Sequence, residues 1–210
     1  MLNLKKNAVT SSVIILCLVV YSLKLCSSSL VFDYLLFDWD KMVSQGQIWR
    51  CFTPALIHFS FSHILMNILF FNYFSEHLEI FRGKYRLVCI ILITGIISNF
   101  AQALFSGNCN FGGLSGVVSG IIGYCIMISP YPYCPEVFRS AISLCVVNII
   151  FNIIAFYMDE PVAFWAHGIG LMAGIVLGIF DYFRLMRQSA LEPKFKDYVE
   201  VIKSNMQIHR

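Results

Sequence analysis

A serine and a histidine stand in two of the most apolar stretches of this 210-residue chain. Ser115 lies in Gly-Gly-Leu-Ser-Gly at residues 112–116, and His167 lies in Ala-His-Gly at residues 166–168. A charged group within a bilayer costs about 2.5 kcal/mol or more, so an ionisable residue there indicates function. Serine with histidine is the smallest set that supplies a nucleophile and its base. The two residues predict a hydrolase whose active site lies inside a membrane.

Ser115 is expected to begin a helix directly after a glycine-rich turn. Gly112 and Gly113 allow the backbone to turn tightly and to approach a substrate closely. The free N–H groups at the start of a helix favour an anion, which places an oxyanion-stabilising backbone beside the serine. The alternative interpretation is a serine that only caps the helix.

His63 and Asn67 are four residues apart and therefore share one face of a predicted helix. Either side chain can donate a hydrogen bond, and a donor aimed at a developing oxyanion stabilises the transition state by about 3–4 kcal/mol. As interhelical hydrogen bonds the same groups contribute about 1 kcal/mol, and spacing alone does not decide between the two roles. His58 precedes this helix, but a zinc motif with a carboxylate is absent. No metal and no cofactor are predicted.

Composition predicts an integral membrane protein. Hydrophobic residues make up 58% of the chain and charged residues 13%, against about 25% charged residues in soluble domains. We expect an all-α bundle of six transmembrane helices in one domain, residues 1–187, followed by a short cytosolic tail, residues 188–210. The expected helices cover residues 10–31, 62–79, 86–105, 114–129, 138–157 and 163–183. Lys and Arg are few and dispersed, so no nucleic-acid surface is predicted.

The fourth helix is short, bounded by the glycine-rich stretch before Ser115 and by Pro130, Pro132 and Pro135. It cannot cross the bilayer fully, so Ser115 is expected below the outer surface. The connection over residues 32–61 mixes aromatic and charged residues, which suits a loop embedded in the headgroup region.

Glycines on the fourth and sixth predicted helices explain how Ser115 and His167 could meet. Gly116 and Gly120 follow the serine, and Gly170 and Gly174 follow the histidine. The two glycines of each pair are four residues apart. Small residues at this spacing let helices pack backbone to backbone. This contact would place both catalytic candidates at the same end of the bundle.

Basic residues predict the orientation of the chain. The connections expected on one side hold more Lys and Arg, and those on the other hold more Asp and Glu. The basic side has Lys5, Lys6, Arg82, Lys84, Arg86, Arg139, Arg184 and Arg187; the acidic side has Asp33, Asp38, Asp40, Asp159 and Glu160. Both termini are therefore expected in the cytoplasm, with Ser115 near the outer face.

These motifs, in this order, resemble the compact six-helix bacterial rhomboid family of intramembrane serine proteases. The resemblance covers Trp49-Arg50 in the first loop, residues 58–67, Glu79 with Gly83, and the two motifs that contain Ser115 and His167. It implies a catalytic dyad of these last two residues. The oxyanion would be stabilised by His63, Asn67 and the backbone N–H of Ser115, with His58, Gly113, Trp49 and Arg50 in support.

The resemblance also implies a setting: a multi-pass protein of the bacterial inner membrane that cleaves transmembrane substrates near the outer surface. Lipid surrounds the protein, and a monomer would be sufficient for catalysis. Two positions depart from the family pattern: Ser119 replaces a tyrosine that packs on the catalytic histidine, and Phe81 replaces an arginine. The alternative function is a catalytically inactive relative that binds membrane-protein clients. A transporter with a broken helix is less well supported, because coupled intramembrane carboxylates are lacking.

Overall fold

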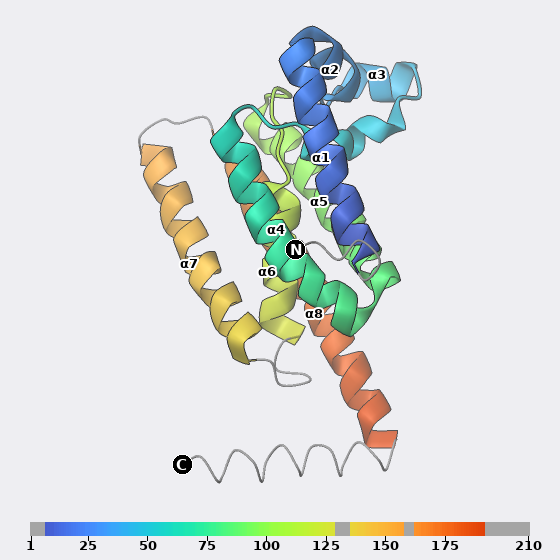
Figure 1. The fold of residues 1–210 in the computed structure, drawn as a ribbon, viewed down its shortest axis with the longest axis vertical. Helices are drawn as coiled ribbons and strands as arrows, with labels where there is room; N and C mark the ends of the chain where they lie inside the picture. Colours follow the sequence, from blue (N-terminus) through green and yellow to red (C-terminus); the bar gives the residue numbers. More distant parts are fainter. Residues whose placement is uncertain (1–6, 129–134, 158–161, 192–210) are drawn as a thin grey trace.

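The protein is a bundle of helices (Figure 1). A computed structural model describes residues 7–128, 135–157 and 162–191, and no strand occurs in these ranges. The long helices are α1 (Ala8–Cys26), α4 (Phe61–Arg82), α5 (Lys84–Ser106), α6 (Ser115–Ile128), α7 (Pro135–Tyr157) and α8 (Phe164–Leu191). The connection between α1 and α4 contains α2 (Ser28–Leu35), α3 (Trp39–Ser44) and two 3-10 turns, η1 (Ile48–Cys51) and η2 (Thr53–Leu56).

Three helices in the described ranges are long and apolar enough to cross a membrane: α1, α5 and the Phe164–Arg187 part of α8. α6 is also apolar but has only 14 residues. α4 and α7, with 22 and 23 residues, have lengths that match a bilayer. The described part of the chain is all-helical, with the apolar spans of an integral membrane protein.

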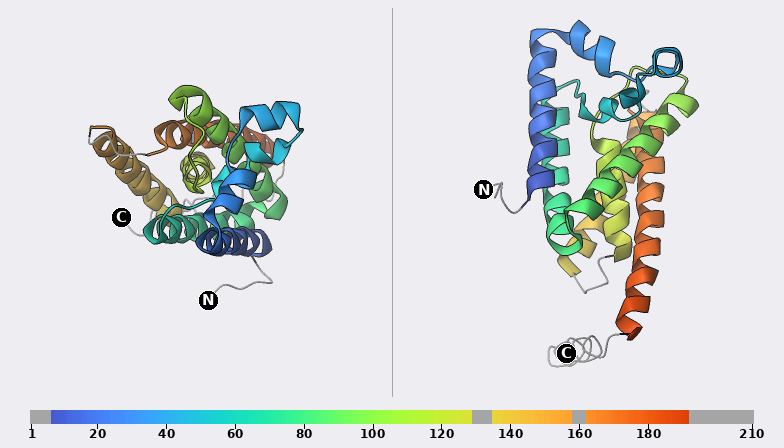
Figure 2. Two further views of the ribbon diagram at one scale, coloured as in Figure 1. Left: turned by 90° about the horizontal axis from the view of Figure 1, so that it is seen from above. Right: turned by 90° about the vertical axis from the view of Figure 1, so that its right-hand side faces the viewer.

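α6 lies at the centre of the bundle, with the other long helices around it when the molecule is seen from above (Figure 2). Every residue from Gly116 to Cys125 is buried. Its most extensive contact is with α8, and it also packs against α5, α7 and α4. A helix that is apolar on all sides is buried on all sides. The residue that begins α6, Ser115, is consequently held by a rigid central element.

The apolar segment expected as one helix over residues 10–31 is two helices, so that prediction was wrong in its second half. Ser27 has extended backbone dihedrals, φ −153° and ψ 95°, and separates α1 from α2. Three consecutive serines, Ser27, Ser28 and Ser29, stand at this point. Serine competes with the helix for backbone hydrogen bonds, which favours a helix end here.

Buried Arg50 fixes the long connection between α1 and α4. Its side chain is 1% exposed. The guanidinium donates to the backbone carbonyls of Leu36, at 2.8 Å, and Asp33. Trp49, its neighbour, is half exposed and donates from Nε1 to the carbonyl of Tyr34 at 3.1 Å. Since a buried charge is tolerated only when it is hydrogen-bonded, Arg50 ties α2 to η1.

Polar contacts also fix the opposite end of the bundle. Glu79 of α4 accepts hydrogen bonds from the backbone N–H and the hydroxyl of Thr10, at 2.9 and 2.8 Å, at the start of α1. Asp181 of α8 lies 2.6 Å from Arg86 Nε and accepts a 2.6 Å hydrogen bond from the Tyr124 hydroxyl. These contacts join α1 to α4, and α8 to α5 and α6.

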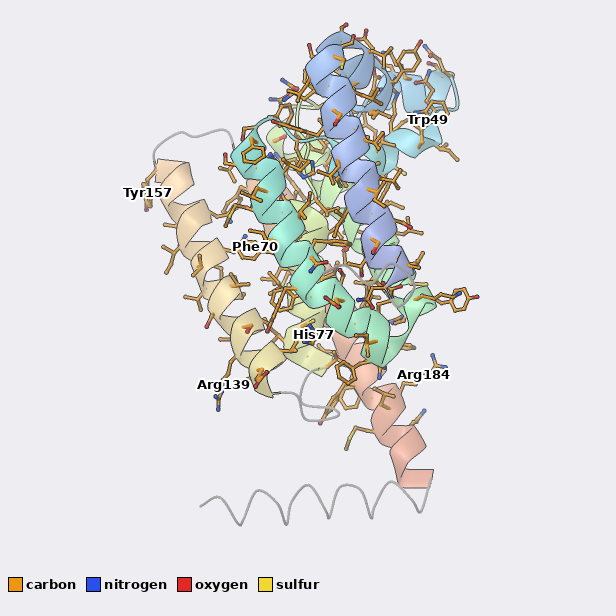
Figure 3. All side chains as sticks on the ribbon, in the orientation of Figure 1. Trp49, Phe70, His77, Arg139, Tyr157 and Arg184 are labelled. Atoms are coloured by element: carbon orange, nitrogen blue, oxygen red, sulfur yellow. The ribbon has the colours of Figure 1, made fainter. Side chains whose placement is uncertain are left out.

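The two ends of the bundle carry different side chains. Figure 3 places Arg139 and Arg184 toward one end, and Trp49 and Tyr157 toward the other. α8 continues to Leu191, and the domain boundary expected at residue 187 stays a prediction. Several predicted features lie outside the described residues: Lys5, Lys6, Pro130, Pro132, Asp159, Glu160 and the tail from residue 192 onward.

Candidate active site

Ser115 and His167 lie in direct contact although 52 positions separate them. Nε2 of His167 is 2.8 Å from Oγ of Ser115. Ser115 is the first residue of α6 and is half-buried, while His167 lies in the first turn of α8 and is 9% exposed. A serine and an imidazole at this distance have the geometry of a nucleophile and its base.

The glycines expected between α6 and α8 lie where these helices touch. A Cβ atom on Gly170 would collide with the backbone carbonyl of Gly116, and one on Gly174 would collide with that of Gly120. Gly116 and Gly120 have a second neighbour that spacing did not reveal: added Cβ atoms there would meet Ser98 and Thr94 of α5. α6 therefore packs closely against α8 on one side and α5 on another.

The loop before Ser115 is held by the connection between α1 and α4. Gly113 has φ +126°, a conformation that L side chains rarely adopt, and its N–H donates to the carbonyl of Pro54 at 3.0 Å. The N–H of Leu114 donates to Nε2 of His58 at 3.4 Å. His58 is fully buried, and its Nδ1 lies 3.2 Å from the carbonyl of Leu56.

His58 lies in the segment between η2 and α4, and its burial determines the protonation state of its ring. Removal of the ring from water, together with the nearby His63, lowers the pKa of His58 to about 4. His58 is therefore neutral at pH 7. A neutral ring can donate from Nδ1 and accept at Nε2, as its contacts require.

His63 lies beside Ser115. A Cβ atom on Gly113 would come within 2.6 Å of His63 Nε2 and within 3.6 Å of Ser115 Oγ, so the imidazole lies over this glycine. The His63 ring also packs edge-on against His58, with centroids 5.0 Å apart. These contacts place His63 against the loop that precedes Ser115.

Asn67 lies one turn further along α4 and is 6% exposed. Its Nδ2 donates to the backbone carbonyl of His63 at 3.0 Å. An amide nitrogen carries two hydrogens, so one remains for another acceptor. Trp49 and Arg50 lie in the first loop and hold its backbone.

The residue that the sequence analysis missed is Asn152 of α7. Its Oδ1 lies 2.9 Å from Nδ1 of His167, and the side chain is 6% exposed. A signal was present: Asn148 and Asn152 are two amides spaced by four residues in the otherwise apolar stretch of residues 144–156. Polar residues on one face of a membrane helix point into the bundle.

No group of three or more His, Cys, Asp or Glu side chains suited to a metal ion occurs among the described residues. The site consists of a serine and a histidine in contact at one end of a membrane helical bundle, with a second histidine and two asparagines close by.

Comparison with known proteins identifies the family. Residues 45–184 match the Rhomboid domain. The chain is 34% identical over 188 residues to the rhomboid protease GlpG of Yersinia pestis (strain Pestoides F) and 33% identical over 188 residues to that of Yersinia enterocolitica serotype O:8 / biotype 1B. Each alignment covers 86% of this chain and 65% of the relative, so the chain spans about two thirds of their length. The protein belongs to the rhomboid family.

Proposed function

We propose that the protein is an intramembrane serine endopeptidase that cleaves transmembrane segments of other membrane proteins. The observation that carries this proposal is the 2.8 Å contact between His167 Nε2 and Ser115 Oγ at the junction of two membrane helices. Its relatives are named rhomboid proteases. The reaction needs no cofactor, and every residue of the proposed site comes from one chain, so a monomer suffices.

Ser115 is the nucleophile and His167 the general base. As Oγ attacks the carbonyl carbon of the scissile bond, its proton moves to Nε2 of His167. The tetrahedral intermediate then expels the amine, which takes the proton from His167, and leaves an acyl ester on Ser115. Water, deprotonated by the same imidazole, attacks the ester and restores the free serine.

Three groups stabilise the oxyanion of both intermediates. The N–H of Ser115 belongs to the first turn of α6, where N–H groups have no acceptor within the helix. The ring of His63, over Gly113, and the remaining amide hydrogen of Asn67 are the side-chain donors. Each such donor contributes about 3–4 kcal/mol to the transition state. Gly113 and His58 support them by fixing the loop before the serine.

The helices are proposed to form six spans, α1, α4, α5, α6, α7 and α8, with the short α6 enclosed by the others. The end that carries Arg82, Arg86 and Asp181 is assigned to the cytoplasm of a bacterial inner membrane, because basic residues concentrate there. Ser115 is then near the outer surface, below the first loop. Both termini would be cytoplasmic.

The alternative is a client-binding relative without activity. A binding protein has no need of a serine and an imidazole at hydrogen-bond distance, so the site favours the protease. The test is cleavage of a purified single-span membrane substrate in detergent by the wild-type chain and by Ser115→Ala. We expect cleavage by the first and none by the second; equal product from both would refute the proposed function.

A further inference from the structure

Asn152 is a buried amide in the apolar part of α7, and both ends of the amide have a hydrogen-bond partner. Oδ1 faces Nδ1 of His167 at 2.9 Å. Nδ2 faces the backbone carbonyl and the side-chain Oδ1 of Asn148, at 2.7 and 3.0 Å. Burial of an amide without partners costs several kcal/mol, so these contacts account for its presence in α7.

The contacts with Asn148 decide which way the Asn152 amide points. Both groups of Asn148 that face Asn152 are oxygens, so they require the NH2 end of its amide. The carbonyl end of Asn152 then faces His167. An oxygen accepts and does not donate, and therefore Nδ1 of His167 carries the hydrogen.

The position of that hydrogen determines the chemistry at the other nitrogen. A neutral imidazole has one N–H and one lone pair. With the hydrogen on Nδ1, the lone pair is on Nε2, the atom that faces Ser115 Oγ. The opposite tautomer would direct an N–H at the serine and could not accept its proton. Ser119, one turn after Ser115, has no ring that could stack on the imidazole to hold it.

We propose that Asn152 is a positioning residue that fixes the tautomer and the ring orientation of His167, so that Ser115, His167 and Asn152 form one hydrogen-bonded chain across α6, α8 and α7. This inference rests on the proposed roles of Ser115 and His167. Asn152 acts through His167 and does not touch the substrate. Asn148 is the outermost residue of this hydrogen-bonded series, because its two oxygens fix the orientation of the Asn152 amide.

The first test measures the tautomer directly, by 15N NMR of histidine-labelled protein in detergent, with the His167 signals assigned by comparison with His167→Gln. We expect the Nδ1–H form in the wild type and a loss of that preference in Asn152→Leu, whose side chain branches at the same carbon but has no acceptor. A predominant Nε2–H form in the wild type would overturn the inference. This readout does not depend on turnover.

The second test compares the kinetics of Asn152→Leu, Asn152→Asp and Ile153→Ala on the same substrate. A misoriented base costs about 10²-fold in rate, so Asn152→Leu should lower kcat by about that factor with little change in KM. Asn152→Asp retains an acceptor and should recover most of the loss. Ile153 is half exposed on the same helix and serves as the control, expected to behave as wild type.

The outcomes separate this inference from the proposed function. Cleavage that Ser115→Ala leaves unchanged would refute the proposed function, and the NMR measurement would still decide the role of Asn152. Cleavage that depends on Ser115 but is unaffected in Asn152→Leu would refute the positioning role alone. Equal losses in the Leu and Asp variants, with equally lowered thermal stability, would show that Asn152 only supports the fold.

Discussion

His167 Nε2 lies 2.8 Å from Ser115 Oγ because α8 and α6 touch backbone to backbone directly below the two residues. Gly170 faces the carbonyl of Gly116, and Gly174 faces that of Gly120. Any side chain at these positions would push the helices apart. The distance between Ser115 and His167 is therefore set by glycines, which have no side-chain functional group.

Gly174→Ala should separate the two helices and lower activity. The added Cβ would collide with the Gly120 carbonyl, and overpacking of this kind costs about 1–3 kcal/mol. A shift of 1 Å at the reacting atoms lowers a rate about 10²-fold. The measurement is kcat on a model transmembrane substrate. Gly168→Ala is the matched control, because a Cβ there meets nothing within 4 Å. Equal activities of the two variants would contradict this explanation.

Asn67→Ala tests whether this amide acts in the transition state or in the fold. A donor to the oxyanion should affect kcat and leave KM nearly unchanged, and we expect kcat to fall about 10²-fold or more. The thermal melting temperature in detergent is measured alongside. A lower melting temperature with normal kcat would assign Asn67 to helix packing, since its Nδ2 already bonds the carbonyl of His63.

Activity should decrease as the pH is lowered. The base must be neutral to accept the proton of Ser115, and imidazoles ordinarily protonate near pH 6.5. The pH–rate profile of kcat over the acidic range, measured with a detergent-stable substrate, checks this. A rate that stays constant down to the pH at which the protein unfolds would be incompatible with a histidine base.

Folding stability should also fall in acid, through His58. Burial lowers the pKa of His58 to about 4 in the folded protein, whereas the unfolded chain protonates near 6.5. Between these values the unfolded state binds more protons, so this contribution to stability is present above about pH 6.5 and is lost as the pH falls toward 4. Melting temperatures at several pH values measure it. His58→Gln should melt with a weaker pH dependence, and an unchanged dependence would exclude His58 as the cause.

The sequence predicted the parts of the molecule that have a local signal. Apolar runs located the long helices, and the serine, the histidine and the glycine spacing predicted which two helices meet. The break at Ser27 was missed because hydropathy continues through it, and α2 and α3 were missed because short helices depend on tertiary contacts. The spacing of Asn148 and Asn152 marked a polar face of α7, but which residue that face meets depends on where α7 lies in the bundle, and no local pattern encodes this position.

The central claim is that Ser115 is activated by His167, and covalent labelling tests it most directly. The purified protein is treated with a fluorophosphonate, which reacts with an activated serine, and the modified residue is located by mass spectrometry of peptides. We expect the label on Ser115 in the wild type, none in Ser115→Ala, and strongly slowed labelling in His167→Ala. Absence of label from Ser115 in folded wild-type protein, or equal labelling rates with and without the His167 imidazole, would contradict the account.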